Sequence, residues 1–571
     1  MRVSWLLWGL VGCGADPASP TLEDAVARQE LSATDHLVRV SMALRGLRPS
    51  VADLETVAAD PDAIEAIVDR YLEAPEFGDT VRDMHAELFR SRVDILRTYL
   101  SYGPLTGVDQ LDIDASVAEG PLRLVEAVVM EDRPYTDIVT SDEAWVDARS
   151  ARVWGVTYDP QGDDWQAQSW PDARPAAGLL TDSALFARHM SVGGNANRGR
   201  AELIANALLC QSFLERDVNV DGSIDLADEA AVADAVETNA GCVSCHQALD
   251  PLAASFWPHR GRVNAARIRF SYDENGQCID DSDYCYPIRY WVPELTLAWQ
   301  RLDLRSPGFY GAPTDDLAHL GDQIADDPRF SLCTAQRVDA YLTQTPTPSV
   351  PHERAAQWQQ TLVDSGFSLR TMIKQIVLSD AFRTVTGSDE DANVGLQTVR
   401  PEQYARLVEQ LTGFEWGASA DRPALNCTAS NACLGDVDLA TTDLFGFRAM
   451  SGGIDGLRVT FPAHSPTPIK TLVMSTFANE AAGYIVAADF AAPPAQRQLL
   501  TMATPTADEA MDRAQLVELH ARILGQLDEP DSEAIDATYG LLETVRAETG
   551  APDAWRAVVS ALLQHPRLMF Y

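Results

Sequence analysis

Positive charge is scarce in this sequence, and lysine is nearly absent. The 571 residues include 44 Lys and Arg against 84 Asp and Glu, which gives a formal net charge of −40 at pH 7. Lys374 and Lys470 are the only lysines. Nucleic acids and anionic membrane surfaces repel a polyanion, so this balance argues against both as partners. We expect a solvated acidic surface.

Several common sequence signatures are also missing. After the N-terminus, no segment has the run of about 20 apolar residues that a transmembrane helix needs. The residues after position 246 contain no G-x-S-x-G, H-E-x-x-H, Walker or dinucleotide-binding motif. No second C-x-x-C or histidine pair follows at the spacing of a zinc ribbon or zinc finger. The usual signatures of hydrolases, metalloproteases and nucleotide-binding enzymes are therefore not found there.

The strongest motif that is present is Cys242-Val-Ser-Cys245-His246. Two thiols at this spacing can add to the two vinyl groups of a haem, and the adjacent His can bind the iron, so C-x-x-C-H is typical of c-type haem attachment. The alternatives are a tight disulfide or half of a zinc site beside an unrelated His. We predict one haem c attached at Cys242 and Cys245, with His246 on the iron.

No motif indicates the sixth iron ligand. There is no Met between His246 and Met372. The nearby candidates are His259 and His319 downstream and His189 and Met190 upstream, and each also fits a surface or core position. A His ligand would predict a lower reduction potential than a Met ligand. A vacant position would favour ligand or peroxide chemistry.

A second candidate site precedes the first. Residues 217–228 read DVNVDGSIDLAD and match an EF-hand calcium loop, with Gly222 at the sharp turn and Asp in place of the usual Glu at the last position. We expect helices over 202–215 and 226–238 around it. The alternative is an acidic capped turn between two helices. The predicted ligands are Asp217, Asn219, Asp221, Ser223, Asp225 and Asp228.

The N-terminus predicts export. Met1-Arg2 precede a short apolar segment, and Leu10-Val11-Gly12-Cys13 resembles the lipobox of bacterial lipoproteins, in which the Cys is lipidated. Gly14 after the Cys is typical of the outer membrane. We therefore expect a protein of the periplasm or cell surface, anchored to the outer membrane by lipidated Cys13. An ordinary secretory signal or a buried apolar strand is the alternative.

The other cysteines agree with an oxidising compartment. Cys278 and Cys285 bracket an acidic loop, and Cys427 and Cys433 bracket a small polar one, so both are plausible disulfides. Cys210 and Cys333 remain and could pair by elimination. The sequence does not determine the connectivity.

Apolar spacing predicts a mainly α, multidomain protein with a small c-type cytochrome-like segment and an irregular, aromatic-rich region. The predicted parts are a signal peptide with lipobox (1–13), a tether (14–34), an N-terminal helical domain (35–145), an irregular connection (146–180), a haem-c segment with the EF-hand-like loop (181–315), a helical domain (316–395) and a C-terminal helical domain (396–571).

Short motifs in a shared order resemble the large exported cytochrome-c-like proteins, built from several domains of unknown function, that are abundant in planctomycetes and myxobacteria. These motifs include Gly178–Thr181, Arg198–Arg200, Leu208–Cys210, Cys242–His246 with Asp250–Leu252, Leu320–Cys333 and Ser365–Arg370. The resemblance implies a haem and export, and it supplies no substrate. One departure is Ala253–Trp257, where the family often has a Gly-Phe-Ala-Leu-Glu-like run. We expect Asp250–Leu252 to form a turn.

The leading functional hypothesis is an exported, lipid-anchored c-type haem protein that transfers electrons with a redox partner protein or serves as the haem subunit of a surface oxidoreductase. One alternative is a non-enzymatic surface lipoprotein stabilised by calcium and disulfides. Another is a peroxidase-like haem enzyme. In the C-terminal half, residues 445–455 and 464–471 are the best candidates for a second site, although simple loop packing explains them better.

Overall fold

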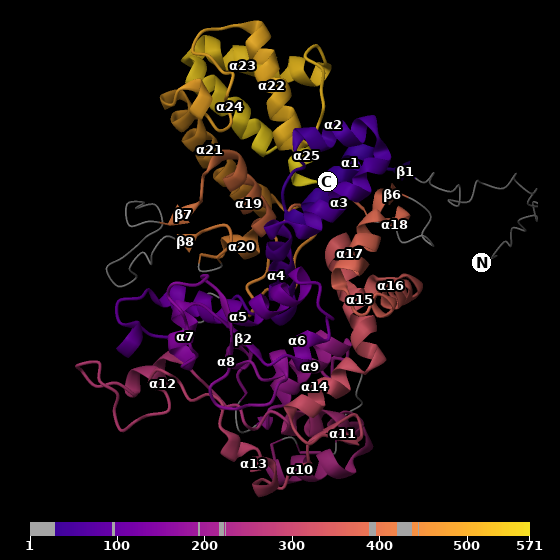
Figure 1. Cartoon of the computed structure of the whole chain (residues 1–571), viewed down its shortest axis with the longest axis vertical. Coiled ribbons are helices and arrows are strands. Elements are labelled where there is room, and N and C mark those ends of the chain that lie inside the picture. Colours follow the sequence, from indigo (N-terminus) through magenta and orange to yellow (C-terminus); the bar gives the residue numbers. More distant parts are fainter. Residues whose placement is uncertain are drawn as a thin grey trace, which may run out of the picture.

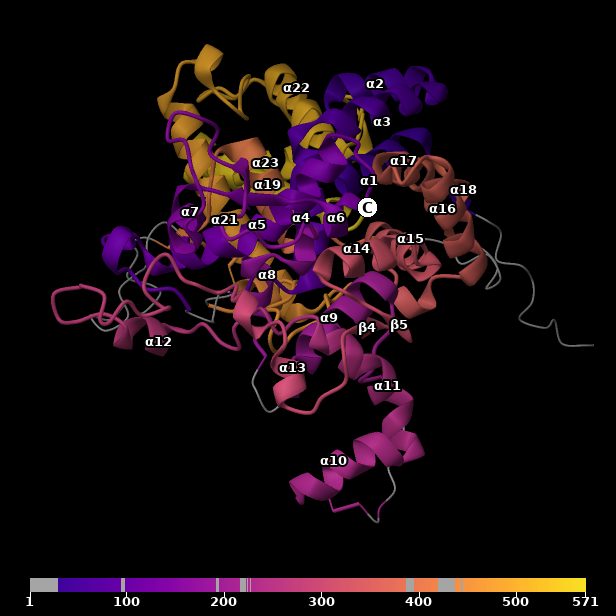
Figure 2. The same cartoon turned by 60° about the horizontal axis from the view of Figure 1, so that its bottom comes forward.

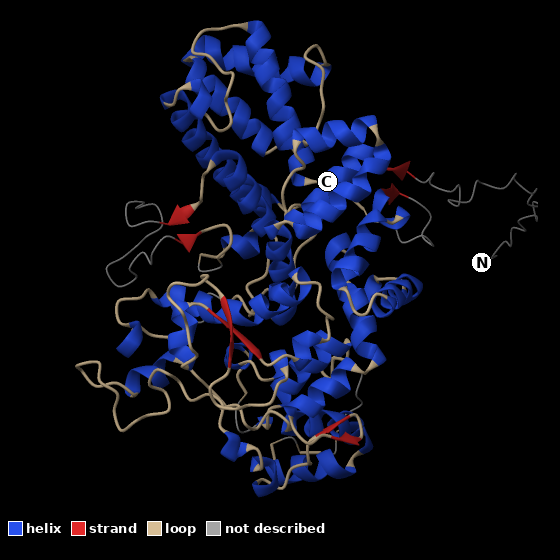
Figure 3. Cartoon of the chain, in the orientation of Figure 1, coloured by secondary structure: helices blue, strands red, loops and turns tan. Residues whose placement is uncertain are grey.

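The computed structural model describes residues 29–93, 98–191, 195–215, 222, 224–225, 227–386, 395–418, 437–442 and 445–571. Helix accounts for 59% of the structure and strand for 5%, so the predicted mainly α fold is confirmed (Figure 3). The described strands form four antiparallel pairs. They are β1 (Gln29–Glu30) with β6 (Thr384–Thr386), β2 (Glu143–Val146) with β3 (Gln166–Ser169), β4 (Gly308–Phe309) with β5 (Ala312–Pro313), and β7 (Gly417–Ala418) with β8 (Val437–Asp438).

Five helices begin the described chain. They are α1 (Ala33–Arg45), α2 (Val51–Ala59), α3 (Ile64–Glu73), α4 (Pro75–Phe89) and α5 (Gln110–Met130). The hydroxyl of Ser32 accepts a hydrogen bond from the backbone N–H of Asp35 and caps α1, which ends where Gly46 adopts a left-handed conformation. Helices α4 and α5 pack together, and Gly78 leaves room there for the side chain of Glu126.

The middle of the chain holds shorter helices. They are α6 (Asp137–Thr140), α7 (Ala148–Trp154), α8 (Ser183–Arg188), α9 (Arg198–Leu209), α10 (Glu229–Thr238), α11 (Ala240–Ala254), α12 (Ala265–Phe270) and α13 (Ala298–Arg301). Helix α11 packs against α9, α10 and β4. Figure 2 shows α10 and the start of α11 projecting from the rest of the molecule, and α10 fully buries only Ala235.

The remaining helices complete the fold. They are α14 (Leu317–Ala325), α15 (Pro328–Thr343), α16 (His352–Asp364), α17 (Leu369–Leu378), α18 (Asp380–Arg383), α19 (Pro401–Thr412), α20 (Phe447–Met450), α21 (Pro468–Ala491), α22 (Glu509–Leu519), α23 (Glu533–Thr549), α24 (Ala551–Leu563) and α25 (Pro566–Met569). In the described ranges, none of the helices combines the length and the apolar character that crossing a membrane requires.

The N-terminal helices pack against the C-terminal end of the chain. The guanidinium of Arg48 donates a hydrogen bond to the carbonyl oxygen of Ile523 at 3.1 Å, and Figure 1 shows α1 beside α25. One cluster of buried apolar side chains runs from Leu37 to Tyr571. The predicted domain boundaries within 35–571 stay predictions, and helices on both sides of them contribute to this cluster.

The irregular region is centred on packed aromatic rings. The ring of His259 lies 4.7 Å from that of Phe186, 5.8 Å from that of Tyr290 and 5.0 Å from that of Trp291, measured between centroids. Around this cluster the chain forms turns, isolated bridges and the short β4–β5 pair. The packing of large rings, and not a regular sheet, therefore holds residues 255–318 together.

Candidate functional site

Cys242, Cys245 and His246 lie in the first half of α11. The side-chain oxygen of Asn239 caps this helix by accepting hydrogen bonds from the backbone N–H groups of Gly241 and Cys242, at 3.0 and 3.4 Å. Residues at positions i, i+3 and i+4 of a helix share one face. Both thiols and the imidazole therefore lie on the same side of α11, where Cys245 is buried and the other two are half-buried.

Asp250 links this motif to α9. Its carboxylate oxygen Oδ1 lies 2.9 Å from Nδ1 of His246, one helical turn earlier. Arg198 approaches the same carboxylate with two nitrogens, Nε at 2.7 Å from Oδ1 and Nη2 at 3.0 Å from Oδ2. Burial alone would raise the pKa of Asp250, but the hydrogen bonds from His246 and Arg198 outweigh it and hold the pKa below its ordinary value.

The contact with Asp250 selects one form of the His246 ring. An ionised carboxylate only accepts hydrogen bonds, so Nδ1 of His246 carries the proton. The lone pair then resides on Nε2, which is the atom that binds a metal when a carboxylate holds Nδ1. The two thiols and this nitrogen together form the donor set that c-type haem attachment requires.

The predicted turn at Asp250–Leu252 is wrong, because these residues belong to α11. Pro251 lacks a backbone N–H, yet the helix continues through it to Ala254. The contact of Asp250 with His246 is the i, i+4 contact that a continuous helix allows. The i, i+4 spacing of His246 and Asp250 is a helical signal that the sequence contained, whereas nothing in the sequence indicated Arg198 as the third partner.

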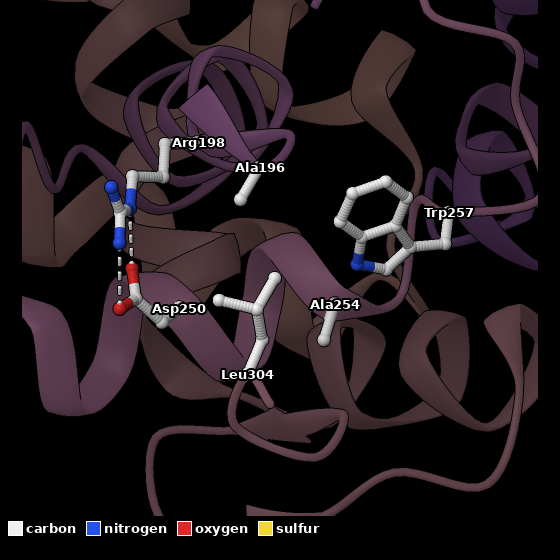
Figure 4. A pocket seen from close by; sticks show the side chains of 6 residues that line it. All are labelled: Ala196, Arg198, Asp250, Ala254, Trp257 and Leu304. Atoms are coloured by element: carbon white, nitrogen blue, oxygen red, sulfur yellow. Dashed lines mark hydrogen bonds and ion pairs between the residues drawn. The ribbon is translucent and has the colours of Figure 1, made fainter. Parts of the chain in front are cut away.

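A small cavity lies behind this pair (Figure 4). Its volume is about 10 Å³, and its lining comprises Ala196, Arg198, Asp250, Ala254, Trp257 and Leu304. Trp257 lies across it from the Arg198–Asp250 pair, and within the described residues its buried indole N–H has no hydrogen-bond partner. The cavity holds about one water molecule. This cavity is therefore too small for a porphyrin.

The state of the thiols bears on the alternatives for this motif. Cys242 and Cys245 are free, whereas Cys210–Cys333 and Cys278–Cys285 are disulfides. Where the chain is described, no three His, Cys, Asp or Glu side chains are grouped to hold a metal ion. The two predicted disulfides that lie in the described residues are thus formed, whereas the two cysteines of the C-x-x-C motif are not bonded to each other. Cys13, Cys427 and Cys433 lie outside the described residues.

Each histidine considered for the sixth position uses one ring nitrogen in another contact. Their contacts are His259 Nε2 with the carbonyl oxygen of Leu180 at 3.2 Å, His189 Nε2 with the carbonyl oxygen of Phe89, and His319 Nδ1 with the carboxylate of Asp315 at 3.5 Å. Burial, Arg200 and Arg174 hold the pKa of His259 well below its ordinary value. His259 is a core side chain, His319 belongs to a surface pair, and His189 and Met190 are half-buried.

The candidate calcium loop is described only at its end. Asp217, Asn219, Asp221 and Ser223 lie outside the described residues. Asp225 accepts a hydrogen bond from the backbone N–H of Ala227 at 3.0 Å, and Asp228 caps α10 through the N–H groups of Ala230 and Ala231. These contacts are those of a capped acidic turn, and calcium binding stays a prediction.

The helix before this loop is shorter than its sequence predicts. We expected a helix over 202–215, but α9 ends at Leu209. Cys210 adopts a left-handed conformation, with φ of 51°, and is bonded to Cys333 of α15. The helix thus ends at a left-handed cap that is fixed to α15, and helix propensity alone contains no trace of this pairing.

The two C-terminal segments, 445–455 and 464–471, meet around Lys470. Its ammonium group donates hydrogen bonds to the carbonyl oxygen of Val399 at 2.8 Å and to Oγ1 of Thr398 at 3.2 Å. It also lies close to Gly452, whose backbone has a positive φ of 97°. These are the contacts of packed loops.

Lys470 lies near both a cation, Arg400, and a carboxylate, Glu402, which partly offsets the effect of Arg400. Burial lowers the pKa of Lys470 to about 8, and neighbouring Arg400 adds to the shift. Burial, Arg400 and Lys470 together lower the pKa of His464 to about 4. The cationic form of each side chain is therefore disfavoured in the folded protein.

No family model, no curated protein and no solved structure matches this chain. The resemblance to exported cytochrome-c-like proteins therefore stays an expectation from the sequence.

Proposed function

We propose that this chain is an exported, lipid-anchored c-type haem protein that transfers electrons with a redox partner protein or serves as the haem subunit of a surface oxidoreductase. One observation carries the proposal. The only free cysteines of the described chain share one face of α11 with His246, and Asp250 leaves Nε2 of that ring available for a metal.

The roles of the residues follow from this arrangement. A bound haem would supply one-electron exchange between ferric and ferrous iron. Cys242 and Cys245 would anchor the group as thioethers, and His246 would bind the iron. Asp250 orients His246, and Arg198 orients Asp250 in turn. Cys242 is half-buried, which supports a haem edge that a partner protein could approach.

Export is part of the proposal. Disulfides persist in oxidising compartments, and Cys210–Cys333 and Cys278–Cys285 both fit such a compartment. The lipidation of Cys13 and the outer-membrane anchor are proposed from the lipobox-like sequence alone.

The decisive test is covalent haem. The full chain is produced with cytochrome c maturation machinery, denatured, and examined as its pyridine haemochrome. We expect a c-type spectrum at one haem per chain, reduced to background by the double variant C242A/C245A. The variant C278A/C285A is the matched control, because it also removes two cysteines and should retain the haem. Wild-type protein without covalent haem overturns the proposal.

The haemochrome assay also distinguishes the proposed function from a second candidate. The capped turn at Asp225 and Asp228 and the two disulfides fit a non-enzymatic surface lipoprotein. That protein would lack haem and would still fold. A peroxidase-like enzyme is a further candidate, because His259 is buried in the core and His189 contacts the carbonyl oxygen of Phe89. It requires an open sixth position, which carbon monoxide binding to the reduced protein would reveal.

A further inference from the structure

We infer that Asp250, braced by Arg198, is a positioning residue that fixes the ring of His246 and lowers the reduction potential of the iron bound to it. The inference rests on the proposed function and goes beyond it by assigning a role to a pair outside the C-x-x-C-H motif. It starts from the three-residue chain of contacts His246–Asp250–Arg198, with distances of 2.9, 2.7 and 3.0 Å.

The first step concerns the partner of the ring. A carboxylate hydrogen-bonded to Nδ1 makes the imidazole more basic than a neutral carbonyl partner does. A more basic ligand donates more electron density to the metal and so stabilises the ferric over the ferrous state. In the one-electron reduction of ferric iron by a redox partner protein, the contact with Asp250 therefore shifts the potential downward.

The second step concerns Arg198. Its guanidinium binds both oxygens of Asp250, a geometry that fixes the plane of the carboxylate. Asp250 is only 9% exposed, so without this cation its charge would be costly to bury. The brace keeps the carboxylate ionised, and an ionised carboxylate is what holds the proton on Nδ1.

The third step concerns water. Trp257, Leu304 and Ala254 line the cavity behind the pair, which has room for about one water molecule (Figure 4). The buried position of Asp250 limits its contact with bulk solvent, which strengthens its electrostatic effect on His246. Within the described residues the indole N–H of Trp257 has no hydrogen-bond partner. It faces this cavity, whose described lining contains one carboxylate, that of Asp250.

The potential tests the inference in the haem-loaded protein. Wild type and D250N are compared by spectroelectrochemical titration, after their haemochrome spectra show equal loading. We expect a more positive midpoint potential in D250N, together with a lower iron–histidine stretching frequency in resonance Raman spectra of the reduced, five-coordinate form. E237Q is the charge control, because Glu237 of neighbouring α10 pairs with Arg305 and not with His246; its stretching frequency should stay at the wild-type value. An unchanged potential in loaded D250N overturns the inference.

A second measurement needs no haem. In C242A/C245A protein labelled with 15N-histidine, the ring signals of His246 are assigned by their loss in H246Q. We expect the Nδ1-protonated form; the Nε2-protonated form would overturn the inference. Absence of haem from wild-type protein defeats the proposed function, whereas a wrong tautomer or an unchanged potential defeats only the role of Asp250. R198K, which keeps the charge but not the two-pronged contact, should weaken the Nδ1 preference.

Discussion

Cys210, which follows α9, is bonded to Cys333 of α15, and the Cys242–His246 motif lies within the stretch of chain that this disulfide closes. The two cysteines are 123 positions apart in the sequence. Helix α9 also packs against α11, which carries the candidate site. The disulfide therefore links the end of α9 to α15. The second disulfide, Cys278–Cys285, spans only 7 positions.

The two disulfides should differ in their contribution to stability. A bridge restricts the unfolded chain more when it closes a longer loop. We expect C210S/C333S to lower the free energy of unfolding by about 5 kcal/mol and C278S/C285S by about 2.5 kcal/mol. Urea denaturation of the two variants measures both losses. Equal losses would show that loop length does not govern them.

Two helical glycines should respond oppositely to alanine. A Cβ on Gly321 of α14 would collide with the carbonyl oxygen of Val139, whereas a Cβ on Gly540 of α23 meets nothing within 4 Å. We expect G321A to cost about 1 to 3 kcal/mol through overpacking and G540A to stabilise by up to about 1 kcal/mol through helix propensity. Thermal and urea unfolding measure both changes, and a neutral G321A would contradict the close approach of α14 to α6.

Lys470 should make stability depend on alkaline pH. Its folded pKa of about 8 lies below the ordinary value of 10.5. Between these values the unfolded chain holds a proton that the folded chain has released, so the free energy of unfolding rises with pH across this window. We expect the free energy of unfolding of the wild type to rise by up to about 3 kcal/mol across this window, and we expect K470M to lack this rise. The measurement is the urea midpoint at a series of pH values.

The other lysine supplies the control. Lys374 forms ion pairs with Glu65 and Asp69 at the surface, and these hydrogen bonds raise its pKa. K374M should therefore keep the rise between pH 8 and 10.5 that K470M loses. If the free energy of unfolding of the wild type falls relative to that of K470M between pH 8 and 10.5, the lowered pKa of Lys470 is contradicted.

Calcium should stabilise the protein through the loop before α10. We expect addition of Ca²⁺ to chelator-stripped protein to raise the melting temperature, because a ligand that binds only the folded state stabilises it. The variant D225N/D228N should abolish the shift and keep the calcium-free melting temperature, since Asn caps a helix about as well as Asp. If Ca²⁺ does not change the melting temperature of stripped wild type, the calcium prediction is wrong and the loop is only a capped turn.

Local patterns predicted much of this protein. Apolar spacing indicated the helical class, and the C-x-x-C-H motif identified Cys242, Cys245 and His246, which the structure places on one face of α11. Sequence proximity also suggested the Cys278–Cys285 bond. Long-range contacts overrode local signals elsewhere. Asp250–Leu252 looked like a turn but is helical, and the helix expected to reach residue 215 ends at Leu209, where the next residue, Cys210, is bonded to Cys333.

The sequence by itself therefore determined the helical class and the grouping of two thiols and an imidazole, because the first depends on apolar spacing along each helix and the second on five consecutive residues. Only the tertiary structure decided that Arg198 reaches Asp250 from 52 positions away and that one apolar cluster joins Leu37 to Tyr571. Such pairings depend on which segments meet when the chain closes on itself, and helical periodicity carries no information about that choice.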